Sequence, residues 1–156
     1  MPKLTENIKP SIFQFFDAQN IGGWEHIYMS AVNAVNAFDS GEQISKSLPL
    51  ETLLYASCND QISKALDIMG VKRDSRNLAL IIFAESPEKA EEAFNKAIKI
   101  IGLTDDKVLE ITPEKFDKLK KLFEISDLEF QAAGSQNVNN LLNLIIERGS
   151  LLRLKR

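Results

Sequence analysis

The 156-residue sequence contains one cysteine and one histidine. Cys58 has no partner for an internal disulfide, and one thiol with one imidazole falls short of the three or four ligands of a zinc site. A Cys58–His26 nucleophile pair would also need a third, orienting residue and an oxyanion site, and nothing nearby supplies them. We therefore expect no catalytic residues, no metal and no cofactor, and interpret His26 as an exposed or hydrogen-bonded surface histidine.

Long apolar runs are also missing, since no stretch approaches the roughly 18 residues needed to cross a membrane. The first ten residues, MPKLTENIKP, lack the basic and apolar regions of a signal peptide. A lone cysteine agrees with a reducing compartment. Because domains usually contain about 100–200 residues, we expect residues 1–156 to form a single domain of a soluble, cytoplasmic protein.

Neither sign of charge is in large excess, with 19 basic and 22 acidic residues and a net charge of -3. A mildly acidic chain of this kind is not a general nucleic-acid binder, so any contact with RNA requires a local basic patch. Basic residues do gather in one part of the sequence, with serines between them: Lys46, Lys64, Lys72, Arg73 and Arg76. Such side chains can contact phosphates without reading bases, although a solvated charged surface would show the same pattern.

Local patterns predict several helices. Trp24, Tyr28 and Val35 belong to an apolar series at three- and four-residue spacing that predicts one buried face of a helix over 24–38. Further helices are expected over 47–57, over 60–69 with Gly70 as a left-handed cap, from Ser86-Pro87 to Gly102, from Thr112-Pro113 to Phe123, and from Asn137 onward.

Three short segments predict strands. Residues 12–16 are aromatic-rich, 108–111 form a short strand, and 78–84 are apolar without alternation, which favours a central strand covered on both faces. The order of helices and strands follows neither strict βαβ alternation nor a helical bundle. The predicted class is α+β, with a small mixed or antiparallel sheet packed against several helices.

The C-terminal helix carries more apolar side chains than one core-facing stripe needs: Leu141, Leu142, Leu144, Ile145, Ile146, Leu151 and Leu152. The surplus can face another protein, or the helix can simply be buried. The sequence pattern leaves both interpretations open.

Three segments together resemble a known family. They are residues 31–38 (AVNAVNAF), residues 44–57 (ISKSLPLETLLYAS) continuing into QISKAL at 61–66, and LIIER at 144–148 followed by Leu151-Leu152. Their order and spacing are similar to those of the kinase-regulatory subunit of the KEOPS complex, and the resemblance covers nearly the whole chain. Two departures stand out: Cys58-Asn59-Asp60 replaces a stretch with glycine and arginine, and Gly149-Ser150 replaces an apolar residue and alanine, which we expect to loosen that helix end.

The resemblance implies a non-catalytic protein that binds the KEOPS kinase-like ATPase and helps to hold transfer RNA, at its 3′ CCA end, for threonylcarbamoyl modification of the adenosine beside the anticodon. It implies a kinase-binding surface at the C-terminal end, for which we predict Leu141, Leu144, Ile145, Arg148, Leu151 and Leu152. The transfer RNA would contact the five basic residues Lys46, Lys64, Lys72, Arg73 and Arg76. The alternatives are a free-standing RNA-binding protein and a small hydrolase or transferase that uses Cys58 or acidic residues.

Overall fold

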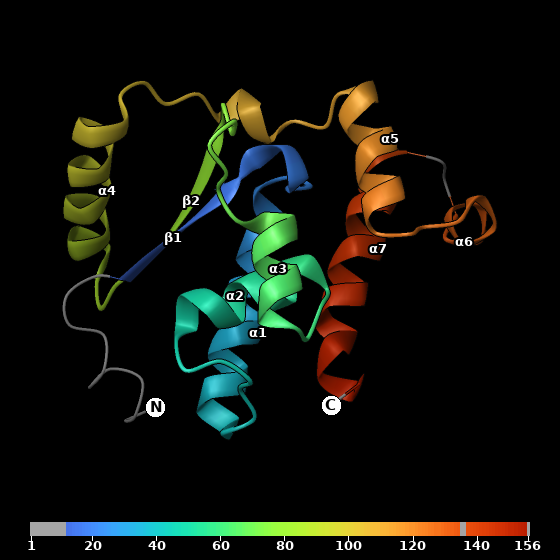
Figure 1. Cartoon of the computed structure of the whole chain (residues 1–156), viewed down its shortest axis with the longest axis horizontal. Helices are drawn as coiled ribbons and strands as arrows, with labels where there is room; N and C mark the ends of the chain where they lie inside the picture. The colour runs from blue at the N-terminus through green and yellow to red at the C-terminus, as the bar shows by residue number, and fades with distance from the viewer. Residues whose placement is uncertain (1–11, 135–136, 156) are drawn as a thin grey trace.

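The computed structural model describes residues 12–134 and 137–155. In Figure 1 a two-stranded sheet runs between helix α4 on one side and the other helices on the opposite side. In chain order the elements are β1 (Ile12–Asp17), η1 (Ala18–Asn20), α1 (Trp24–Ser40), α2 (Leu48–Ser57), α3 (Ile62–Met69), β2 (Leu78–Phe83), α4 (Pro87–Ile101), η2 (Asp106–Leu109), α5 (Pro113–Leu122), α6 (Asp127–Ala132), α7 (Val138–Ser150) and η3 (Leu151–Lys155), where η marks a 3-10 helix. The α+β prediction, with an antiparallel sheet, is confirmed.

Helix α2 lies at the centre of the core. Every residue from Glu51 to Ser57 is buried, and Leu53, Leu54 and Tyr55 are almost completely shielded from water. A helix that is buried all round must be enclosed by other elements. Helices α1, α3 and α7 pack against it and supply that enclosure.

The two strands pair antiparallel, with Phe16 opposite Ala79. These two residues are buried, whereas the rest of β2 is only partly covered. The prediction of a strand over 78–84 is confirmed, but its central, doubly covered position is wrong for the part of the chain that the structure describes, where β2 pairs with β1 alone. Helix α4 contacts β2, and none of the α4 residues is itself buried, which agrees with the partial cover of this strand.

Helix ends follow local hydrogen-bonding signals. Ser86 caps α4 as predicted, because its hydroxyl accepts a hydrogen bond from the Lys89 amide at 3.3 Å. The predicted strand over 108–111 is wrong, since Asp105 accepts from the Lys107 amide and starts the 3-10 helix η2 instead. Helix α6 was missed. Ser126 caps it and Glu129 stands three residues later, a capping-box spacing that could have revealed it.

Two glycines are required by close approach of the backbone rather than by a left-handed conformation. Gly70 has φ −68°, so the predicted left-handed cap is wrong; a Cβ there would lie 2.4 Å from the Leu66 carbonyl oxygen. Helix α7 continues through Gly149 and ends one residue later at Ser150, where η3 follows, so the expected loosening of this helix end stays a prediction. A Cβ at Gly149 would lie 2.8 Å from the Tyr55 carbonyl oxygen, which means that glycine lets α7 pack directly on α2.

His26 is buried, with only 1% of its surface exposed, so its predicted surface position is wrong. Its Nδ1 accepts a hydrogen bond from the Gly22 amide at 3.0 Å, and its Nε2 lies 2.9 Å from the Ala56 carbonyl oxygen. These two partners are satisfied together by the neutral imidazole with its proton on Nε2. The ring also packs edge-on against Phe123. Through its contact with Ala56, His26 joins the start of α1 to the end of α2.

Burial lowers the pKa of His26 from 6.5 to about 4, with a smaller effect from the positive charge of Lys115. The unfolded chain takes up a proton near its ordinary pKa, whereas the folded chain does so only near the lowered one. The stabilisation is therefore complete above about pH 6.5 and is lost as the pH falls toward about 4. We predict a loss of about 2 kcal/mol in unfolding free energy between about pH 7 and pH 5 from this residue.

Urea unfolding at both pH values measures this loss, with His26→Gln as the reference variant because glutamine does not titrate. Titration of the carboxylates is common to both proteins and cancels in the difference. The variant should be less stable near neutrality and should show a smaller loss on acidification. An equal loss in the two proteins would show that His26 is not held neutral by the fold.

Candidate functional site

The residues considered for catalysis are structural. Cys58 is half-buried and ends α2 with φ 54°. Its thiol donates to the Ile145 carbonyl oxygen at 3.6 Å, and burial raises its pKa to about 12. The thiolate that a nucleophile needs is therefore strongly disfavoured near neutral pH. Within residues 12–134 and 137–155, no three histidine, cysteine, aspartate or glutamate side chains are grouped so as to hold a metal ion.

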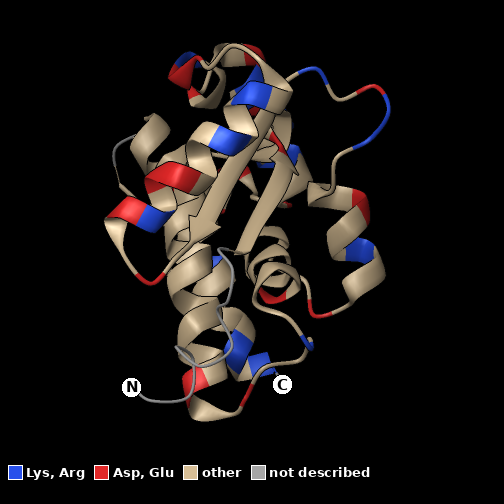
Figure 2. Cartoon of the chain, turned by 90° about the vertical axis from the view of Figure 1, so that its left-hand side faces the viewer, with Lys and Arg blue, Asp and Glu red and all other residues tan. Residues whose placement is uncertain are grey.

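The five basic residues predicted to bind RNA are all exposed, and none forms an ion pair with a residue that the structure describes. Lys72, Arg73 and Arg76 lie in the loop between α3 and β2, and Lys64 lies on α3. In Figure 2 this loop, with its blue basic sections, extends away from the body of the molecule. Two of the five, Lys72 and Arg76, line one cavity.

The segment that carries the family resemblance most strongly has a clear folding role. The buried Glu51 carboxylate accepts hydrogen bonds from the amides of Ile44 and Ser45 at 3.1 and 2.8 Å. The Ser45 hydroxyl donates to the Ser47 carbonyl oxygen at 2.7 Å. These bonds shape the entry into α2 while Lys46 remains exposed.

The predicted kinase-binding residues separate into buried and accessible ones. Leu141, Ile145 and Leu152 are at most 2% exposed and belong to the core, so in this fold they cannot be contact residues for a partner. Leu144 is half-buried, and Leu151 is 43% exposed. This result corrects the prediction for these three positions, and α7, which carries two of them, packs against both α1 and α2.

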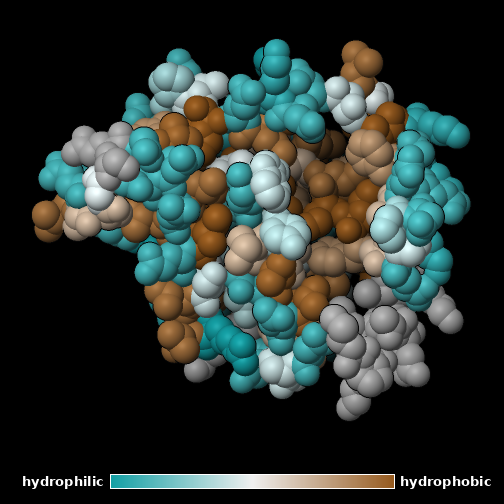
Figure 3. Space-filling view, turned by 180° about the vertical axis from the view of Figure 1, so that it is seen from behind, coloured by the Kyte–Doolittle hydropathy of each residue, from teal (hydrophilic) through white to brown (hydrophobic). Residues whose placement is uncertain are grey.

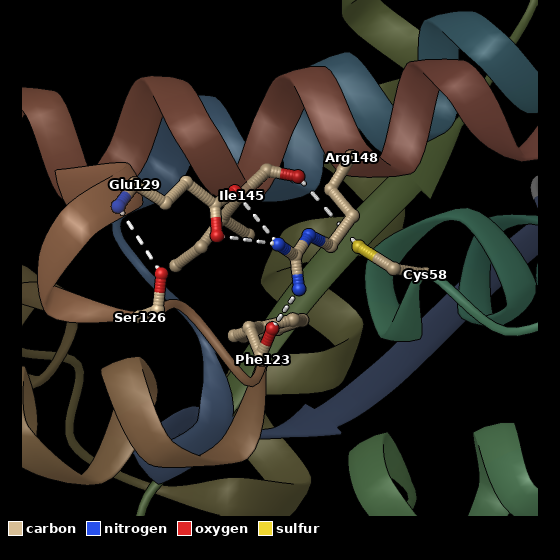
Figure 4. A network of polar contacts seen from close by, with 6 residues as sticks. All are labelled: Cys58, Phe123, Ser126, Glu129, Ile145 and Arg148. Carbon is tan, nitrogen blue, oxygen red and sulfur yellow. Dashed lines mark hydrogen bonds and ion pairs between the residues drawn. The ribbon is translucent and has the colours of Figure 1, made fainter. Parts of the chain in front are cut away.

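The guanidinium group of Arg148 is engaged within the molecule. Figure 4 shows it between α7 and the segment that carries Phe123 and Glu129. It donates hydrogen bonds to both carboxylate oxygens of Glu129, at 2.7 and 2.9 Å, and another to the Phe123 carbonyl oxygen. Both bonds to Glu129 come from one nitrogen, Nη2, while Nη1 bonds to Phe123, so Arg148 fastens α6 and the end of α5 to α7.

Two aromatic residues that were predicted to be buried are exposed. Trp24 and Tyr28 are 62% and 56% exposed, and their ring centroids lie 6.1 Å apart on successive turns of α1. The buried side of α1 is instead formed by small residues and Ile27. The sequence pattern could not distinguish these faces, because α1 carries apolar side chains on more than one of them.

Helices α1 and α7 form one layer that extends into η3. Asn33 donates to the Ser150 hydroxyl at 3.1 Å, and farther along Arg153 forms an ion pair with Glu42. Leu151 and Leu154 of η3 are 43% and 78% exposed beside this end of α1. The layer therefore presents apolar side chains at both ends, Trp24 and Tyr28 at one and the two leucines at the other.

A third apolar region lies by the sheet. In Figure 3, viewed from behind, hydrophobic side chains gather in a hollow beside α4. A separate groove of about 490 Å³ runs between β1 and α3, where Phe13, Leu66 and Val71 are among the lining residues.

Among the described residues, no helix combines the length and hydrophobicity required to cross a membrane.

Comparisons with known proteins agree with the resemblance inferred from the sequence. The chain is 29% identical over 145 residues to the regulatory protein Cgi121 of Methanocaldococcus jannaschii, covering 92% of this chain and 85% of that protein. It is 30% identical over 145 residues to the EKC/KEOPS complex subunit CGI121 of Debaryomyces hansenii, covering 86% of this chain and 74% of that protein. The model of a family described as kinase binding protein CGI-121 matches residues 2–152. The protein therefore belongs to the CGI-121 family of kinase binding proteins.

Proposed function

We propose that this protein is a non-catalytic, cytoplasmic subunit of a KEOPS complex that binds the kinase-like ATPase and helps to recruit transfer RNA by its 3′ CCA end. In that complex it would serve the threonylcarbamoyl modification of the adenosine next to the anticodon. The observation that carries this proposal is the match of nearly the whole chain to a family of kinase binding proteins. The yeast relative named as a KEOPS subunit supports the choice of complex.

The kinase-binding surface that we propose is the α1–α7–η3 layer. It keeps Leu144, Leu151 and the end of α7 from the sequence prediction and adds Trp24 and Tyr28. Exposed aromatic residues are frequent anchors of interfaces because they bury a large rigid area at little entropic cost. Arg148 contributes indirectly, since its bonds to Glu129 and Phe123 hold α7 in place.

We predict that Trp24→Ala weakens binding of the kinase-like ATPase by about thirtyfold or more, because truncating an interface anchor commonly costs about 2 kcal/mol. Leu151→Glu should weaken it further, since a carboxylate would be desolvated without a partner. Calorimetric titration with the purified ATPase measures both. Ile100→Ala is the matched control, because Ile100 is 87% exposed on α4, across the sheet from this layer.

Melting curves separate binding from folding in this experiment. Trp24→Ala and Leu151→Glu should remain folded, whereas Leu152→Glu should unfold because Leu152 is only 2% exposed. If the folded Trp24 and Leu151 variants bind the ATPase with unchanged affinity, the partner contacts a different surface.

For transfer RNA, we predict that replacing Lys46, Lys64, Lys72, Arg73 and Arg76 by alanine weakens binding and makes it less dependent on salt. When a phosphate contact is lost, binding releases fewer counterions, and the slope of log affinity against log salt falls in magnitude by about one. The control is the double variant Lys96→Ala, Lys99→Ala on α4, which tests whether the loss of exposed lysines outside the patch has the same effect. A transfer RNA without its CCA end tests the proposed contact with that end. Unchanged affinity and slope in the fivefold variant would exclude the patch.

The proposal also requires that the chain be inactive by itself. We predict no ATP hydrolysis and no transfer RNA modification by the purified protein, because the structure holds the Cys58 thiol protonated and the His26 imidazole bonded to backbone. Turnover that co-purifies with the chain and disappears in Cys58→Ala would favour the hydrolase alternative. RNA binding without any affinity for the ATPase would favour a free-standing RNA-binding protein.

A further inference from the structure

The outer edge of β1, on the side away from β2, has no partner strand in the part of the chain that the structure describes. The Ala18 amide donates to the Asn77 carbonyl oxygen at 3.0 Å, so this pair and every second pair before it carry the hydrogen bonds between the two strands. Phe13 and Phe15 lie between those pairs and therefore direct their backbone N–H and C=O groups outward. The Phe15 carbonyl oxygen accepts from the Gln14 side chain at 2.6 Å. The two amides and the Phe13 carbonyl oxygen have no backbone partner among the described residues.

Strand β1 also lacks the features that usually protect such an edge. Exposed edge strands in natural proteins carry charged residues, proline or a bulge, because unpaired backbone groups attract other strands. The run from Ile12 to Phe16 contains no charge and no proline, and its pairing with β2 is regular throughout. An uncharged, regular edge of this kind is suited to accept another strand.

The apolar groove of about 490 Å³ lies along this same edge. The rings of Phe13 and Phe15 meet edge-on with centroids 5.6 Å apart on one face of β1. Leu66 of α3 and Val71, two residues after α3 ends, line the groove with them. Phe13, Leu66 and Val71 are 55%, 44% and 47% exposed, and none of the lining residues is charged. A segment in this groove would meet backbone hydrogen-bonding groups at β1 and apolar side chains around it.

One end of the groove is positively charged. The α3–β2 loop starts after Val71 and returns at Leu78, both of which line the groove. The loop contains one acid, Asp74, and three cations: Lys72, Arg73 and Arg76. Strand β1 runs toward this end, because its last residue, Asp17, accepts a hydrogen bond from Ser75 of the loop at 2.7 Å. A strand antiparallel to β1 would start here, so acidic residues at its N-terminal end would meet the cations.

We propose that the groove binds an extended peptide segment of a partner protein, which adds to β1 as an antiparallel third strand. The segment has apolar side chains at alternate positions, preceded by acidic residues. Directly opposed residues of an antiparallel pair have their side chains on the same face. The apolar residues therefore stand opposite Phe13 and Phe15, and it is their backbone groups that exchange hydrogen bonds with β1. The groove lining shares no residue with either surface proposed above.

The probe is a fluorescein-labelled octapeptide of two glutamates followed by alternating valine and threonine (EEVTVTVT), titrated with the full-length protein at low salt and followed by fluorescence anisotropy. We expect saturable binding. Methylation of the three valine amides should weaken it by at least about tenfold, because these amides face β1 and lose their hydrogen bonds. Methylation of the three threonine amides is the matched control and should change the affinity by less than about twofold, since these amides point away from β1.

A protein variant locates the site. Leu66→Gln should weaken binding of the octapeptide by about tenfold, because a neutral amide replaces an apolar wall of the groove without altering its charge. Ile100→Gln is the matched control, since Ile100 is exposed on α4 and does not line the groove. Both variants should melt like the unmodified protein, because both side chains are accessible to water.

The charge at the end of the groove is tested with a peptide in which lysines replace the two glutamates (KKVTVTVT). It should bind at least about fivefold more weakly at low salt, and the difference should shrink as salt is added. Equal affinities of the two peptides at low salt would contradict the proposed acidic end. These titrations contain neither RNA nor ATPase, so their outcome is independent of the proposed KEOPS function.

Three further results would overturn the inference. The first is the absence of saturable octapeptide binding, and the second is equal binding of the valine-methylated and threonine-methylated peptides, since backbone pairing must distinguish them. The third is a dimer of the unmodified protein in analytical ultracentrifugation that is lost in Leu66→Gln, which would make a second copy of this chain the occupant of the groove.

Discussion

The burial of α2 on all sides is the constraint on which the rest of this structure depends. A helix with no solvent-facing side leaves its neighbours little freedom, because every face must be covered and every polar group inside must be paired. Gly149 meets the first requirement by letting α7 approach the Tyr55 carbonyl oxygen. His26 and Glu51 meet the second, as their buried polar atoms bond to backbone groups at the two ends of α2. Residues that resembled candidates for catalysis are thus parts of the core.

The same constraint decides what is left for partners. Since Leu141, Ile145 and Leu152 are buried in the core, the large apolar groups exposed on α7 and η3 are Val138, Leu151 and Leu154. On α1, small residues face the core and the bulky Trp24 and Tyr28 face outward. The exposed apolar surface of this layer is therefore a by-product of how α1 and α7 close the core. It combines residues from opposite ends of the sequence.

Charge is arranged differently from apolar surface. The α3–β2 loop holds its cations on an extended segment, and the Asp17–Ser75 hydrogen bond fixes the base of that loop to the sheet. Lys118 reaches the same place from α5. A loop supported in this way can present cations in a defined position although the chain as a whole is mildly acidic. Electrostatic attraction to a phosphate is then local rather than general.

The sequence by itself determined the α+β class, the two strands, predicted at 12–16 and 78–84, and most helix boundaries, because these depend on local periodicity, capping side chains and prolines at helix starts. It also carried the family resemblance. Only the tertiary structure decided that His26 is buried, that Trp24 is exposed, and that Arg148 bonds to Glu129 rather than standing free. Only the fold placed Lys118 beside Lys72. An apolar or charged residue on a helix can face core or solvent with the same spacing, and which occurs depends on what packs against it from distant parts of the chain.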